Sequence, residues 1–181
     1  MRVIGIDPGT RHLGWGVLER VGTRIAHVAH GVIDCDEKLP LHERLVIIDV
    51  ELGQVIATHA PEFGAVEGIF FAKNAQSAAK LGHARGVVLL RLAQARLGIA
   101  EYAPALVKKT VAGRGASDKN QVAMLVTAIL RLASPPRSDA ADALAIALTH
   151  LSVSSFASQV KAQAQLQARS ARTSHRRAKL L

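Results

Sequence analysis

Residues 2–33 read RVIGIDPGTRHLGWGVLERVGTRIAHVAHGVI, and this segment predicts three consecutive β-strands. Apolar and β-branched residues concentrate in three runs, residues 2–6, 12–19 and 24–33. Two short connections separate the runs, Asp7-Pro8-Gly9-Thr10 and Arg20-Val21-Gly22-Thr23, and both contain turn-forming residues. The segment therefore predicts an antiparallel three-strand meander.

Helices and strands are predicted to alternate after the meander. Apolar residues at helical spacing predict a helix over 39–59, and a short apolar run predicts a strand at 63–67. The later predicted elements are a helix over 74–97 between Asn74 and Gly98, a strand at 99–103, a helix from Pro104, and helices over 118–132 and 138–151. This order describes an α/β fold with a mixed five-stranded sheet and helices on both faces.

Composition limits the classes of protein that are possible. The chain has 181 residues, 49% of them hydrophobic, enough for one substantial core, which we assign to a single domain over residues 1–156. No apolar run approaches the ~18 residues of a membrane span. The single cysteine, Cys35, excludes an internal disulfide and fits a reducing environment. We therefore expect a cytoplasmic protein with no membrane partner.

Positive charge is concentrated in two parts of the chain. The net charge is +9, and residues 152–181 contain six basic residues and no acidic ones. Residues 73–137 contain eleven basic residues against only Glu101 and Asp118. Such an excess favours the phosphate backbone of a nucleic acid as partner. Residues 157–181, rich in Ala, Gln, Ser and Arg without an apolar stripe, predict a basic, disordered tail.

Four carboxylates occur where strands end and a helix begins. Asp7 and Glu67 each end an apolar run, and Asp139 and Asp142, three residues apart, share one face of an alanine-rich helix. Each acid has an ordinary explanation alone, as a turn residue, a strand-end group or a partner of the helix dipole. If the strands are neighbours and the helix crosses them, the four acids converge. Such a cluster needs cations, and its hard oxygen ligands select Mg²⁺ or Mn²⁺. Two ions ~3.5–4 Å apart could straddle a scissile phosphate.

Four motifs resemble those of the RuvC family of Holliday junction resolvases, in the family's order and over about residues 1–155. They are GIDPGT at 5–10 with GWG at 14–16, EGIFFAKN at 67–74, KLGHARG at 80–86 and DAADALA at 139–145. The resemblance implies an RNase H-like fold with Asp7, Glu67, Asp139 and Asp142 as the catalytic metal ligands. It also implies that Phe70 stacks on unpaired bases and that Lys119 lies near the scissile phosphate. Phe70 could instead be a core residue beside Phe71.

The predicted activity is a Mg²⁺-dependent endonuclease that resolves four-way DNA junctions in recombination and repair. The acidic motifs contain no Ser, Tyr or Cys, so water attacks the phosphate directly. The two-fold symmetry of a junction favours a homodimer, and the helix over 74–97 is the candidate dimer element. A branch-migration motor is a further candidate partner. The basic candidates for DNA contact are Lys73, Lys80, Arg85, Lys108, Arg114 and Lys119.

Three alternatives differ in substrate or activity. An RNase H-like enzyme that acts on RNA is compatible with the same residues. The segment Gly5–Thr10 also resembles the phosphate-binding hairpin of sugar-kinase and actin-like ATPases, but those proteins are much longer and carry a second hairpin and an adenosine site. A non-catalytic nucleic-acid-binding module has no use for four convergent acids, because they repel DNA unless a metal neutralises them.

Overall fold

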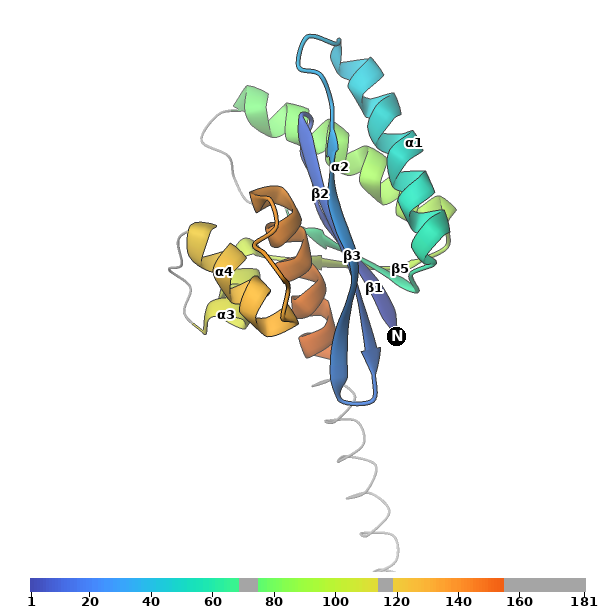
Figure 1. Cartoon of the computed structure of the whole chain (residues 1–181). Coiled ribbons are helices and arrows are strands. Elements are labelled where there is room, and N and C mark those ends of the chain that lie inside the picture. Colours follow the sequence, from blue (N-terminus) through green and yellow to red (C-terminus); the bar gives the residue numbers. More distant parts are fainter. Residues whose placement is uncertain (69–74, 114–118, 155–181) are drawn as a thin grey trace, which may run out of the picture. The chain divides into compact units, whose positions relative to one another are not determined.

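The computed structural model describes residues 1–68, 75–113 and 119–154, with backbone only at 75–77, 119 and 120. The chain divides into two units, Met1–His150 and Leu151–Leu181, and the first unit holds the sheet. Its elements in chain order are β1 (Arg2–Asp7), β2 (His12–Val21), β3 (Arg24–Asp34), α1 (Leu41–His59), β4 (Phe63–Glu67), α2 (Ala75–Gln94), β5 (Gly98–Tyr102), α3 (Pro104–Ala112) and α4 (Lys119–Leu130) (Figure 1). A further helix, called the final helix, begins at residue 138.

The five strands form one mixed sheet in the order β3-β2-β1-β4-β5. β1, β2 and β3 pair antiparallel, with Gly22 in the left-handed region at the β2–β3 turn. β4 pairs parallel with β1, and β5 pairs parallel with β4. Parallel pairing needs a crossover, and α2 provides it between β4 and β5. The predicted meander and the mixed five-stranded sheet are both confirmed.

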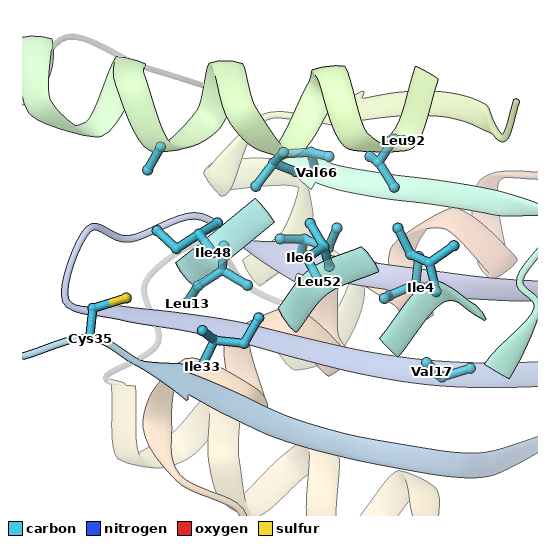
Figure 2. Close-up of a cluster of buried hydrophobic side chains, with 13 residues drawn as sticks. Ile4, Ile6, Leu13, Val17, Ile33, Cys35, Ile48, Leu52, Val66 and Leu92 are labelled. Atoms are coloured by element: carbon cyan, nitrogen blue, oxygen red, sulfur yellow. The ribbon is translucent and has the colours of Figure 1, made fainter. Parts of the chain in front are cut away.

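One face of the sheet packs against α1 and α2. Ile4 and Ile6 of β1 join Ile48 and Leu52 of α1 and Leu92 of α2 in one buried cluster (Figure 2). All five side chains are fully buried. Because side chains alternate along a strand, the residues between Ile4 and Ile6 and after Ile6 point to the opposite face. Asp7 is therefore turned away from this core.

The final helix covers that opposite face at very short range. A Cβ added to Gly5 would lie 2.1 Å from the Ala143 carbonyl oxygen, and one added to Gly14 would lie 1.9 Å from the Asp139 carbonyl oxygen. The helix contributes Ala143 and Ala147 to this contact, so both surfaces lack bulky side chains there. The alanines around Asp139 and Asp142 thus allow the close approach that their small size predicts.

Several element boundaries differ from the predicted ones. α2 ends at Gln94 instead of residue 97, because Arg96 adopts a left-handed φ of 58° and its N–H donates to the Ala93 carbonyl. Gly98 therefore begins β5 and does not end the helix. α4 ends at Leu130 in the same way, with Arg131 at a φ of 54°. The final helix extends to residue 154 instead of 151, and the predicted Asn74 cap lies outside the described residues.

Candidate active site

Asp7 and Glu67 lie side by side at the ends of neighbouring parallel strands. Ile6 of β1 is in register with Val66 of β4, so the next residue of each strand falls at the same level. Ile6 and Val66 both belong to the cluster under α1 and α2, and the alternation of side chains turns Asp7 and Glu67 to the other face. Neighbouring strands are about 4.7–4.9 Å apart, which is close enough for the two carboxylates to share a cation.

The contact between the final helix and β2 sets the position of the other two acids. Gly14 of β2 pairs directly with Asp7, and the Asp139 carbonyl rests on Gly14. The first turn of the final helix is therefore held beside the end of β1. Asp142, three residues after Asp139, lines one cavity of about 270 Å³ together with Asp7 and Glu67. Asp139 is not among the residues that line this cavity, although it begins the same helix face.

The other described residues that line the 270 Å³ cavity belong to α3 and α4. Pro104, Val107 and Lys108 line it from α3, and Val122 lines it from α4. Val107 and Val122 are buried, at 7% and 4% exposure. An apolar wall beside carboxylates lowers the local dielectric and strengthens interactions with a bound cation. Lys108 adds one positive charge at the same cavity.

The acids fit a hard divalent cation by their chemistry. Their donors are carboxylate oxygens from three separate elements, the ligand type that Mg²⁺ and Mn²⁺ prefer. Among residues 1–68, 75–113 and 119–154, however, no three Asp, Glu, His or Cys side chains already form a metal-binding group. The backbone nevertheless brings Asp7, Glu67 and Asp142 to one cavity.

Comparison with known proteins gives the family of this chain. A family model described as "Crossover junction endodeoxyribonuclease RuvC" matches residues 3–150. The chain belongs to the RuvC family. The crossover junction endodeoxyribonuclease RuvC of Sorangium cellulosum is 66% identical to it over 180 residues, covering 99% of both chains. The RuvC of Azorhizobium caulinodans is 52% identical over 150 residues, covering 83% of this chain and 89% of that one.

A solved structure extends the match to three dimensions. The structure titled "T. thermophilus RuvC in complex with Holliday junction substrate" superposes with a TM-score of 0.77 at 40% identity, covering 83% of this chain and 93% of that one. This match confirms the RNase H-like fold of the RuvC resolvases. Membership of the family also identifies the chain as an endodeoxyribonuclease, a hydrolase that acts at crossover junctions. Within the described helices, none is long and apolar enough to cross a membrane.

The predicted DNA contacts of this RuvC-family chain have different surroundings. Lys80 is exposed on α2 and lines a cavity of about 460 Å³ with Arg11 and Arg44, whereas Lys108 faces the acids. Arg85 is paired with Glu101 of β5, and only 19% of its side chain is exposed. Its guanidinium is thus engaged within the protein. Phe70, Lys73 and Arg114 lie outside the described residues, and only the backbone of Lys119 is described, at the start of α4.

One ionic cluster near the acids was not foreseen from the sequence. Arg137 donates from Nη1 to Asp34 Oδ2 at 2.6 Å and from Nη2 to Asp34 Oδ1 at 2.8 Å. Asp34 Oδ1 also lies 2.7 Å from His12 Nδ1. Hydrogen bonds from Arg137 and then His12 lower the pKa of Asp34 to about 2. Asp34 and Arg137 are 103 positions apart in the sequence, which explains why no local sequence pattern indicated this pair.

A larger cavity lies elsewhere on the same unit. It measures about 850 Å³, and four of its lining residues are Arg24, His27, His30 and Arg131. His27 Nε2 lies 2.8 Å from His30 Nδ1, and burial, together with His30, lowers the pKa of His27. Among the described residues that line it there is no Asp or Glu, so this lining does not fit the oxygen-ligated cation that the four acids predict.

Proposed function

We propose that Asp7, Glu67, Asp139 and Asp142 form the catalytic centre of this RuvC-family endonuclease and that they hold two Mg²⁺ ions, with Mn²⁺ as a substitute. The observation that carries the proposal is the cavity that Asp7, Glu67 and Asp142 line from three separate elements. Carboxylates from a rigid sheet and a packed helix can keep a fixed spacing, which two-metal hydrolysis requires. Asp139 is included because it lies on the same face of the final helix as Asp142, three residues earlier.

The residues around the acids have separate roles in this proposal. When bound, the ions would supply an activated water and stabilise the leaving oxygen of the phosphodiester. Asp7 and Glu67 provide the fixed side of the centre from the sheet, and Asp142 closes it from the final helix. Val107 and Val122 exclude water from one wall. Lys108 offers a positive charge to a phosphate that approaches the cavity, and its presence offsets part of the repulsion between DNA and the acids.

The substrate that fits this centre is a four-way DNA junction, cut by paired hydrolysis in two strands. Two cuts call for two centres, and we propose a homodimer in which α2 contributes to the interface. Phe70, Lys73, Lys80, Arg114 and Lys119 are proposed DNA contacts, and Arg85 would have to exchange its partner Glu101 for a phosphate. A branch-migration motor is a proposed further partner. The DNA substrate and the lone Cys35 favour a cytoplasmic location.

The test compares a synthetic four-way junction, a linear duplex and an RNA–DNA hybrid, each with and without Mg²⁺. We expect paired, symmetric nicks in the junction only with the metal, and little cutting of the two linear substrates. Asp7→Asn keeps the side-chain shape but removes a ligand, so it should abolish nicking while junction binding persists. Asp36→Asn removes the same charge from an exposed loop and should cut normally. Nicking by Asp7→Asn at the wild-type rate would exclude Asp7 from the centre, and preference for the hybrid would favour the RNA alternative.

A further inference from the structure

Asp34 joins three segments that meet next to the proposed centre. It is the last residue of β3, and it pairs in register with His12, the first residue of β2. Its carboxylate accepts two hydrogen bonds from Arg137, which immediately precedes the final helix. The Arg137 carbonyl in turn accepts a hydrogen bond from the Ala141 N–H, at 2.9 Å, in the first turn of that helix. Arg137 is thus bound to the sheet by its side chain and to the helix by its backbone.

The ionic cluster of His12, Asp34 and Arg137 is close in sequence to the contact between Gly14 and Asp139, which sets the spacing of the acids. Asp139 follows Arg137 by two residues, and Gly14 follows His12 by two residues. Gly14 is the residue on which the Asp139 carbonyl rests, and it pairs with Asp7. A bidentate Arg–carboxylate pair fixes direction as well as distance. The Asp34–Arg137 pair therefore restrains the first turn of the final helix relative to the strand that carries Asp7.

We propose that Asp34 and Arg137 are positioning residues for the endonuclease, which hold Asp139 and Asp142 in register with Asp7 and Glu67. This inference rests on the proposed catalytic centre. Both residues are assigned a positioning role because their side chains bind each other, with Arg137 Nη1 2.6 Å from Asp34 Oδ2 and Nη2 2.8 Å from Asp34 Oδ1. His12 supports the pair by holding one oxygen of Asp34.

Because the Asp34–Arg137 pair is exposed, a role in positioning the acids can be distinguished from a role in stabilising the fold. The Arg137 and Asp34 side chains are 55% and 51% exposed, and ion pairs this exposed contribute little to global stability. Loss of the pair should therefore leave the fold intact. Small displacements of metal ligands, in contrast, have large effects on metal affinity and rate. A change in metal dependence without a change in melting temperature is thus the signature of this role.

The experiment uses the full-length chain with Arg137→Gln, Asp34→Asn and the exchanged double variant Asp34→Arg/Arg137→Asp. Single-turnover cleavage of a four-way junction is measured across a Mg²⁺ titration, together with melting temperature and junction affinity without metal. Each single variant should raise the Mg²⁺ concentration for half-maximal cleavage by about tenfold. The exchanged pair should recover part of this effect. It should not recover all of it, because the exchange removes the 2.7 Å contact between Asp34 Oδ1 and His12 Nδ1.

A second ion pair provides the matched control. Arg91 of α2 donates to Asp49 of α1, with Nε 2.7 Å from Oδ1, and this pair lies among the helices on the other face. Arg91→Gln and Asp49→Asn should leave the Mg²⁺ titration unchanged, although these side chains are more buried, at 28% and 33% exposure.

Three results would overturn the inference. The first is a wild-type Mg²⁺ titration in both single variants while Asp7→Asn is inactive, which leaves the proposed centre standing. The second is weaker metal-free junction binding by Arg137→Gln but not by Asp34→Asn, which would make Arg137 a DNA contact. The third is full activity of Asp7→Asn, which removes the centre itself and the positioning role with it.

Discussion

The contact between Gly14 and the final helix gives the sharpest prediction for activity. A Cβ at position 14 would lie 1.9 Å from the Asp139 carbonyl oxygen and 2.3 Å from its carbonyl carbon. Real Cβ contacts essentially never fall below 3.0 Å, so the two backbones have to separate by at least 1.1 Å in Gly14→Ala. Both partners are backbone atoms, and no side-chain rotation can relieve the overlap. The acids of the final helix therefore move away from Asp7 and Glu67.

The magnitude follows from this displacement. A shift of about 1 Å in a reacting geometry can cost ~100-fold in rate, and we expect a decrease of that order in single-turnover cleavage of a four-way junction. Overpacking typically costs about 1–3 kcal/mol of stability. For a domain of this size, that corresponds to a fall of roughly 2–12 °C in melting temperature. Gly14→Ala should thus remain folded at 25 °C and lose most of its activity.

Gly64→Ala is the control that distinguishes displacement of the final helix from a general loss of stability. Gly64 lies on the α1 and α2 face of β4, and a Cβ there would lie 2.7 Å from both methyl carbons of Leu92, a side chain that can turn. Gly64→Ala should lose similar stability and keep its cleavage rate within about threefold, because the acids stay in place. Equal cleavage rates for the two variants, at equal melting temperatures, would refute the role of the Gly14 contact.

Four further outcomes are expected. Combining Asp7→Asn with Glu67→Gln should cost little more activity than either change alone, because both serve one centre; additive effects in a double-mutant cycle would contradict this. Phe70→Ala should slow junction cleavage far more than it lowers the melting temperature, whereas a destabilisation of ~3–5 kcal/mol would indicate a core residue. Deletion after Phe156 should flatten the log–log salt dependence of DNA binding by about 0.9 for each phosphate that the tail neutralises, and identical slopes would mean that the tail does not bind DNA. Burial lowers the pKa of His150 from 6.5, so its contribution to stability is complete above pH 6.5 and is lost as pH falls towards the lowered value; thermal melts of His150→Gln between pH 7 and 5 should show a shallower decline than the wild type.

Hydrophobic periodicity and turn residues were sufficient to predict most of the fold. The strand at Phe63–Glu67 and the helix that begins at Pro104 have the predicted starts, because an apolar run and an N-terminal proline act locally. The predicted end of α2 was wrong, because Arg96 takes the left-handed conformation where Gly98 was expected to end the helix. That outcome depends on the position of β5, which the local sequence does not specify.

The sequence by itself determined which residues could serve as ligands. Asp7 and Glu67 end apolar runs, and Asp139 begins an alanine-rich helix, so their chemistry and local setting are properties of short segments. Only the tertiary structure decided that β1 and β4 are neighbours in register. It also decided that Asp142 lines the same cavity as Asp7 and Glu67. It also decided that Asp34 binds Arg137, 103 residues away. Strand order and ion pairs of this kind arise from long-range packing of the sheet and helices, and this packing has no signature in any single window of sequence.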